Sequence, residues 1–111
     1  MTAVELKLRT KQFALRVIKL VAALPKTIEG RAIANQLVRC GTSVAANYRS
    51  ACRARVVLEE ADETQLWLEL IIESKLLPVK RVEGLLWEAS ELVAIFVVSR
   101  KSASSNLRST I

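Results

Sequence analysis

The residues that could support chemistry in this chain are mainly basic, and most of them lie in its first half. Residues 1–55 contain eleven lysines or arginines against two acids, whereas residues 56–111 contain six against nine. An excess of positive charge attracts phosphate groups, so the pattern is typical of a surface that contacts nucleic acid. It also fits two oppositely charged halves that pack against each other, and the sequence leaves both interpretations open.

Catalytic signals are weak. The chain contains no histidine, the commonest general base and metal ligand in proteins. Ser43, Cys40 and Cys52 have no adjacent base that would activate them as nucleophiles. On one helix the two cysteines would stand about 18 Å apart, too far for a disulfide, and without histidine they are too few for a zinc site. We therefore predict a protein that is not an enzyme, has no catalytic residues and needs no metal or cofactor.

An acidic run precedes Thr64 and consists of Glu59, Glu60, Asp62 and Glu63. A di-iron helical bundle needs Glu-x-x-His pairs on two helices, and the chain has no such pair. We interpret the run as a solvated or salt-bridged helix face, which is the usual environment of such charges.

Several basic residues share one face of a helix predicted over residues 30–52. Arg31, Arg49 and Arg53 fall within about 40° of one another at 100° per residue, opposite the apolar positions. Tyr48 adjoins Arg49 and could stack on a base, although a plain solvated surface is the alternative. The candidate nucleic-acid-binding residues are Arg31, Asn35, Tyr48, Arg49, Arg53 and Arg55.

Two further polar residues are predicted to have structural roles. Asn47 falls on the apolar seam of the same helix, so we expect it to be largely buried, hydrogen-bonded and important for helix register. Arg39 lies at the edge of that seam, and we expect it to pair with Glu60 or Glu63 on the next helix.

Apolar residues at three- and four-residue spacing predict an all-α fold of four helices, over residues 4–24, 30–52, 57–75 and 79–102. Short connections favour an antiparallel up-down bundle in one domain, 1–102. Gly41, inside the second helix, indicates a close helix approach or a kink. Residues 103–111 form a polar tail that we expect to be disordered.

The third predicted helix is apolar on more than one face. Trp67 lies about 100° from the seam residue Leu68, and Leu70 and Ile71 extend the apolar surface. Tryptophan is enriched in interface cores, so we predict a subunit interface at Trp67, Leu70 and Ile71. Packing of Trp67 at the edge of its own bundle is the alternative.

No apolar stretch approaches the roughly 20 residues of a membrane-spanning helix, and the charged N-terminus does not look like a secretory signal. We therefore expect a cytoplasmic protein that does not interact with a membrane.

Residues 36–51, QLVRCGTSVAANYRSA, resemble a bacterial family of four-helix bundles encoded within intervening sequences of large-subunit ribosomal RNA genes. Other stretches that look like the family are Leu24-Pro25, residues 58–64 together with 67–70, and residues 88–95. The resemblance covers nearly the whole chain. It implies an antiparallel bundle and a homo-oligomer, since pentamers are known among these proteins. A related branch, the accessory protein of diversity-generating retroelements, is a basic pentamer that binds nucleic acid and a reverse transcriptase.

The chain departs from the family pattern between Arg55 and Val56, where about three helical turns are missing. This comparison predicts a third helix that is shorter than its neighbours, with a second helix that unwinds to cover the gap, or a fusion of the second and third helices into one rod. From these observations we expect a protein that binds RNA or DNA through basic faces. The alternative is a scaffold or accessory subunit that binds an acidic protein partner.

Overall fold

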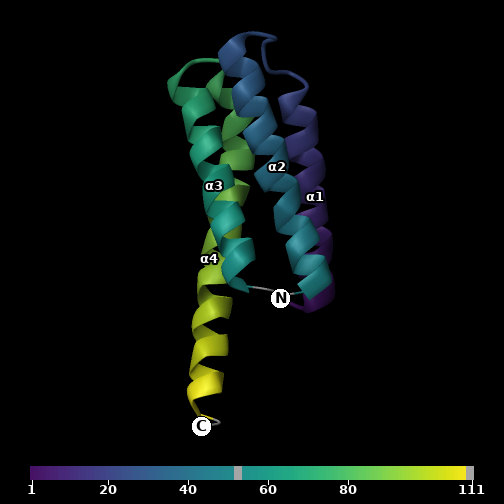
Figure 1. The fold of residues 1–111 in the computed structure, drawn as a ribbon, viewed down its shortest axis with the longest axis vertical. Coiled ribbons are helices and arrows are strands. Elements are labelled where there is room, and N and C mark those ends of the chain that lie inside the picture. The colour runs from purple at the N-terminus through teal and green to yellow at the C-terminus, as the bar shows by residue number, and fades with distance from the viewer. Residues whose placement is uncertain (52–53, 110–111) are drawn as a thin grey trace.

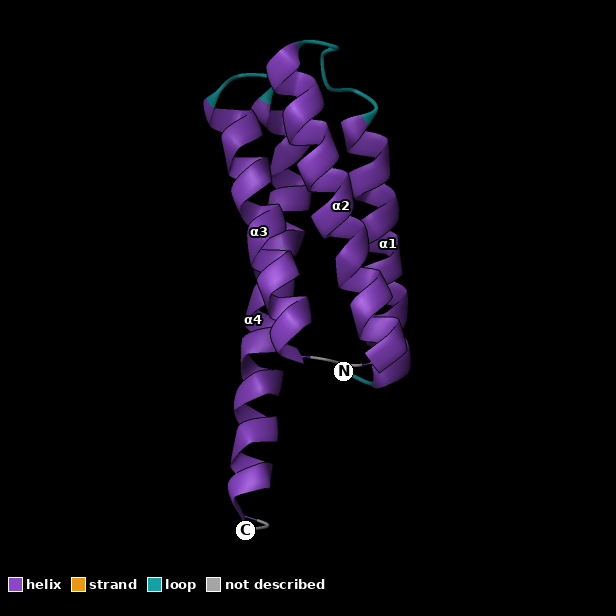
Figure 2. Cartoon of the chain, in the orientation of Figure 1, coloured by secondary structure: helices purple, strands orange, loops and turns teal. Residues whose placement is uncertain are grey.

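The fold is an all-α bundle, seen in a computed structural model that describes residues 1–51 and 54–109, with side chains described up to Ser50 and from Ala54 to Val98. Four helices occupy these ranges: α1 (Ala3–Val21), α2 (Ile28–Ala51), α3 (Ala54–Glu73) and α4 (Val79–Ser109). Consecutive helices run antiparallel, and α4 returns beside α1 to close the bundle (Figure 1). Figure 2 shows that the described residues form helices and loops without a strand. The predicted fold class is therefore confirmed.

Local side-chain contacts set the beginnings of the first two helices. Thr2 and Glu5 form a capping box at the start of α1, in which each side chain accepts a hydrogen bond from the other residue's backbone N–H. The Thr27 hydroxyl accepts a hydrogen bond from the N–H of Gly30, so α2 begins at Ile28 rather than near Gly30.

The end of α3 is a Schellman turn built on a lysine. Lys75 adopts a positive φ of 60°, and the Leu76 N–H donates to the Ile71 carbonyl at 3.1 Å while the Lys75 N–H donates to Ile72. This turn ends α3 at Glu73 and reverses the chain into α4 two residues after Leu77. A left-handed turn thus forms without the usual glycine.

The third helix is shorter than both of its neighbours in the chain, as expected. With 20 residues, α3 compares with 24 residues in α2 and 31 residues in α4. It also packs along α2 as the second arm of an antiparallel hairpin, so the two helices are not fused into one rod. At the other end of the chain, α4 continues to Ser109, where we had expected a disordered tail from residue 103.

One continuous hydrophobic core fills the space between the four helices. Its largest fully buried side chains include Phe13 of α1, Leu37 of α2, Leu68 of α3 and Phe96 of α4. Each comes from the apolar seam of its helix, so the periodicity in the sequence correctly identified the inward faces.

Gly41 allows α1 and α2 to approach closely. A methyl group built at Gly41 would stand 2.8 Å from both γ-carbons of Val17, which is fully buried. The prediction of a close helix approach is thus confirmed, and Val17 occupies the space that a side chain at position 41 would need.

No helix in the described ranges is both long and apolar enough to cross a membrane.

Candidate nucleic-acid interface

A basic groove lies between α1 and α2 near the N-terminal end of the bundle. The α2 side of the groove contains only small side chains, Thr42, Ala45 and Ala46, besides Arg49. Because these side chains are short, they leave an open groove of about 490 Å³ between the two helices. The segment that carries the family resemblance therefore forms one wall of this groove.

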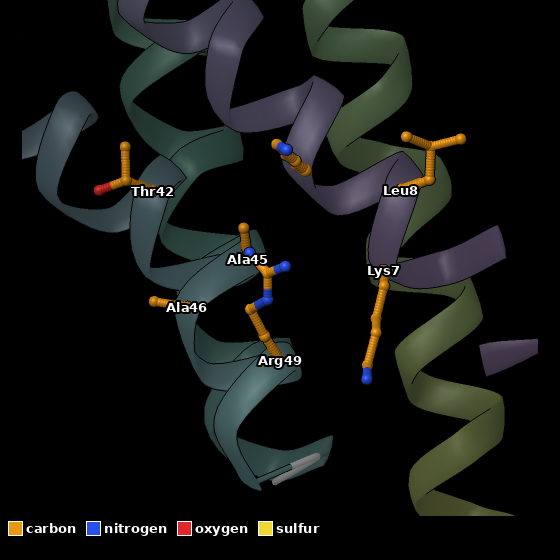
Figure 3. A pocket seen from close by; sticks show the side chains of 7 residues that line it. Lys7, Leu8, Thr42, Ala45, Ala46 and Arg49 are labelled. Atoms are coloured by element: carbon orange, nitrogen blue, oxygen red, sulfur yellow. The ribbon is translucent and has the colours of Figure 1, made fainter. Parts of the chain in front are cut away.

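Three cationic side chains line the groove: Lys7 and Lys11 from α1, and Arg49 from α2. All three are exposed, and none of them forms an ion pair with a described side chain. Figure 3 shows Arg49 reaching from α2 into the space between the helices, with Lys7 and Leu8 on the α1 side. Unpaired cations on two facing helices can bind the phosphate groups of a nucleic-acid backbone.

The structure brings only Arg49 of the predicted arginine face into this groove. Arg31 and Asn35 are exposed on α2 as expected, but Arg31 is 18 positions before Arg49, which corresponds to about 27 Å along the helix. Neither Arg31 nor Asn35 lines the groove, and of the two only Arg31 adds positive charge to the surface of α2. Arg53 lies outside the described residues.

Two other candidates are engaged within the protein. Tyr48 is half-buried, and its ring packs against Phe96 of α4 with centroids 5.8 Å apart, so it serves the core rather than a free stacking surface. Arg55, at the start of α3, pairs with Glu59 one turn later through a 3.3 Å contact between Nε and Oε1. Neither residue contributes to the groove.

Arg39 joins α2 to α3, which confirms its predicted pairing. Its guanidinium lies 2.5 Å from Glu63 Oε2 and 3.6 Å from Glu60 Oε2. The hydrogen bond and charge of Glu63 raise the pKa of Arg39 above its ordinary value. This arginine is therefore a link between helices and is not part of the unpaired basic surface.

Of the two acids beside Arg39, Glu60 is the one whose Oε2 lacks a hydrogen bond among the described residues. Its Oε2 is buried, and it accepts no hydrogen bond from the described residues because the contact to Arg39 is too long. Burial raises the pKa of the Glu60 carboxyl, partly offset by the charge of Arg39, and Glu63 and Glu59 raise it further. Within the described ranges, no three Cys, Asp or Glu side chains are grouped closely enough to hold a metal ion.

Asn47 differs from its prediction. Its side chain is half-buried rather than largely buried, and its Nδ2 donates a 2.9 Å hydrogen bond to the Ser43 carbonyl of the same helix. Because this bond stays within α2, it does not fix the position of α2 against another helix.

The predicted interface residues on α3 separate into three environments. Ile71 is fully buried in the core, so its assignment to a subunit interface was wrong. Trp67 is partly buried against the core, with its indole N–H buried and unpartnered among the described residues. Leu70 is exposed, and Leu66 beside it is more so. Only Trp67 and Leu70 of the original set remain available for an interface.

Sequence reasoning missed the polar link between α1 and α4. Arg9 donates two hydrogen bonds of 2.7 Å, from Nε and Nη2, to the two carboxylate oxygens of Glu88. It also missed Lys7 and Lys11, whose i,i+4 spacing on one helix face was the available signal. Spacing along one helix does not reveal which helix faces that side.

Comparison with solved structures supports the fold. The chain is similar to a protein of unknown function from the S23 ribosomal protein family of Bacteroides thetaiotaomicron, with a TM-score of 0.76 and 26% sequence identity. The match covers 84% of this chain and 95% of the other. Searches of protein-family models and of curated proteins gave no match.

Proposed function

We propose that this protein is a non-enzymatic bundle that binds the phosphate backbone of RNA or structured nucleic acid through the groove between α1 and α2. The observation that carries the proposal is the group of three unpaired cations, Lys7, Lys11 and Arg49, around a groove with no acidic lining residue. The groove contacts backbone rather than base edges, so binding depends on shape and charge more than on sequence.

Two likenesses support an RNA partner. The α2 segment resembles proteins encoded within intervening sequences of ribosomal RNA genes, and we place the chain in that group as part of the proposal. The similar Bacteroides protein belongs to a family named after a ribosomal protein, although its own function is unknown.

The test is a titration against an RNA hairpin and a DNA duplex at about 50 mM and about 200 mM salt. Wild-type binding should weaken steeply with salt, because phosphate contacts release counterions. In Lys11→Gln/Arg49→Gln, each lost contact should lower the slope of log K against log salt by about 0.7 to 0.9.

A matched control removes the same charge from the opposite end of the bundle. Lys26→Gln/Lys75→Asn changes two exposed loop lysines that do not line the groove between α1 and α2, and asparagine tolerates the positive φ of position 75. If the two double variants lose the same affinity for nucleic acid, the loss follows from the change in net charge and not from the groove. Absence of wild-type binding at low salt would reject the proposal.

The second candidate function is a protein-interaction scaffold, for which a separate observation exists. Val4, Leu8, Leu15 and Ile18 repeat on the outer face of α1, and each is 47% to 76% exposed. Large exposed side chains at this spacing are typical of a helix that packs against a partner. An acidic protein that binds α1 after nuclease treatment would favour this function, and a Leu15→Glu variant should then lose the partner while it retains RNA.

We also propose that the chain forms a homo-oligomer, with a pentamer as the form that the family resemblance implies. Exposed Leu66 and Leu70 beside Trp67 give α3 an apolar outer surface that a second copy could cover. Mass measurement of Trp67→Glu and of Leu66→Glu/Leu70→Glu tests this. Since Trp67 packs on the core, the leucine variant is the cleaner one, and an unchanged mass in that folded variant would contradict the assembly.

A further inference from the structure

A second basic groove lies between α1 and α4, at the end of the bundle opposite the N-terminus. Its lining contains four cationic side chains: Arg16 and Lys19 from the last turns of α1, and Lys80 and Arg81 from the first turn of α4. The groove measures about 430 Å³, and no acidic residue lines it. Antiparallel packing of α1 and α4 brings these residues together from segments more than 60 positions apart in the sequence.

The four cations have no counterion among the side chains that the structure describes. None of them appears in an ion pair with a described side chain, whereas Arg9, Arg39 and Arg55 each do. Of the acids on α4, Glu88 is held by Arg9, and Glu83 neither lines the groove nor forms an ion pair with a described side chain. The groove therefore concentrates positive charge that an external anion would neutralise.

The start of α4 adds to this positive charge. Free backbone N–H groups give the first turn of a helix a partial positive charge, which acidic side chains normally balance. The first turn of α4 contains no acid and carries Lys80 and Arg81 instead, an arrangement that opposes helix stability. A local conflict of this kind is expected where residues serve binding rather than folding.

Gly84 shapes the floor of the groove. A methyl group built at Gly84 would stand 3.5 Å from Nη2 of Arg16, the one atom within 4 Å of it. The Arg16 guanidinium thus extends from α1 across the groove to the surface of α4. Gly84 lies one turn along α4 from Lys80 and Arg81. Guanidinium and ammonium groups from both helices therefore border the same groove.

We infer that the groove between α1 and α4 is a phosphate-binding site, distinct from the groove between α1 and α2, and that its ligand carries linked phosphate groups. Arginine offers a planar pair of donors to phosphate oxygens, while lysine supplies a point charge. The phosphates could come from a free oligophosphate or from a nucleic-acid strand, and both present the same chemistry to Arg16, Lys19, Lys80 and Arg81.

The experiment compares wild type with Lys80→Gln/Arg81→Gln, using Lys26→Gln/Lys75→Asn as the charge-matched control. Calorimetry with inorganic pyrophosphate measures the first source, and titration with a single-stranded RNA measures the second. We expect the Lys80/Arg81 variant to bind at least about tenfold more weakly, the size of one lost charge-assisted contact, while the control stays close to wild type. The thermal midpoint of the Lys80→Gln/Arg81→Gln variant should equal or exceed that of wild type, because this variant lacks two unfavourable cations in the first turn of α4.

Weaker pyrophosphate binding in the Lys80/Arg81 variant assigns the site to free phosphates. Weaker RNA binding, with no pyrophosphate binding by wild type, assigns it to a strand. If neither ligand depends on Lys80 and Arg81 beyond the control, the site does not exist. The pyrophosphate measurement contains no nucleic acid and the variant leaves Lys11 and Arg49 intact, so this result stands apart from the proposed function.

Discussion

Arg9 and Glu88 hold α1 and α4 together through two parallel hydrogen bonds, although 79 residues separate them in the sequence. Both side chains are mostly shielded from water, with 26% and 11% of their surfaces exposed. The hydrogen bonds and charge of Glu88 raise the pKa of Arg9, against the opposing effect of burial. A pair with this geometry is expected to be much stronger than an exposed ion pair.

Replacement of Arg9 by alanine should lower the free energy of unfolding by about 2 to 3 kcal/mol, since it leaves the Glu88 carboxylate shielded and without its partner. Arg9→Ala/Glu88→Ala should cost less than the sum of the two single variants, with a coupling energy of about 1 to 3 kcal/mol in urea unfolding. The exposed Arg55–Glu59 pair is the control, for which about 0.3 to 0.5 kcal/mol is expected. Equal coupling in the two pairs would contradict the prediction.

Glu60→Gln should stabilise the protein at neutral pH. Burial raises the pKa of Glu60 above its ordinary value of 4.5, so the folded state binds the proton more tightly than the unfolded state. The contribution of Glu60 to stability is then complete below about pH 4.5 and is lost as pH rises through the folded pKa. The advantage of the glutamine variant in urea unfolding should therefore shrink as pH is lowered from 7 toward about 4.

The matched control for this pH effect is Glu59→Gln, which changes an exposed glutamate on the same helix. It should show no comparable gain at neutral pH. An advantage of Glu60→Gln that grew on acidification would refute the proposed sign.

Cys40 should react with thiol reagents only when the protein unfolds. The thiol is fully buried, and burial raises its pKa to about 11, partly offset by the Thr64 hydroxyl 3.2 Å from its sulfur. At pH 8 about one thiol in a thousand would be ionised. In a Cys52→Ser variant, labelling by Ellman's reagent should be slow in buffer and rapid in concentrated urea; rapid labelling of the folded protein would show that Cys40 is accessible.

Gly41 and Gly84, which both lie inside helices, should respond oppositely to replacement by alanine. Gly41→Ala places a methyl group 2.8 Å from Val17, and the expected overpacking cost of about 1 to 3 kcal/mol exceeds the gain of about 1 kcal/mol in helix propensity. Gly84→Ala meets only a flexible guanidinium at 3.5 Å, so it should stabilise by about 0.5 to 1 kcal/mol. Thermal melts of both variants test this, and Val17→Ala should suppress the defect of Gly41→Ala.

The sequence predicted those features that depend on one helix at a time. The seam position of Leu68 was identified correctly because burial repeats with the helical period. The helix beginnings were predicted less accurately: α2 begins at Ile28, two residues before the predicted start, because Thr27 accepts a hydrogen bond from the Gly30 N–H. The third helix was predicted over residues 57–75, and the structure places α3 at Ala54–Glu73, so its length was predicted closely and its bounds were shifted by two to three residues.

Features that depend on the axial positions of two helices were mostly beyond the sequence. The Arg9–Glu88 pair and the meeting of Lys7 and Lys11 with Arg49 each require the relative height of helices that a periodic pattern does not provide. Arg39 was predicted correctly because its partners lie on the next helix of a hairpin, where a short connection limits the possible register.

The contact between Val17 and Gly41 and the pair between Arg9 and Glu88 also limit how the bundle can move. They fix α1 against α2 and against α4 at two heights, eight residues or about 12 Å apart along its axis. A rod held at two separated points can neither slide nor turn about its axis without breaking one of them. Any ligand that enters either basic groove must therefore be accommodated by movement of the long lysine and arginine side chains. The backbone of α1, which borders both grooves, keeps its position.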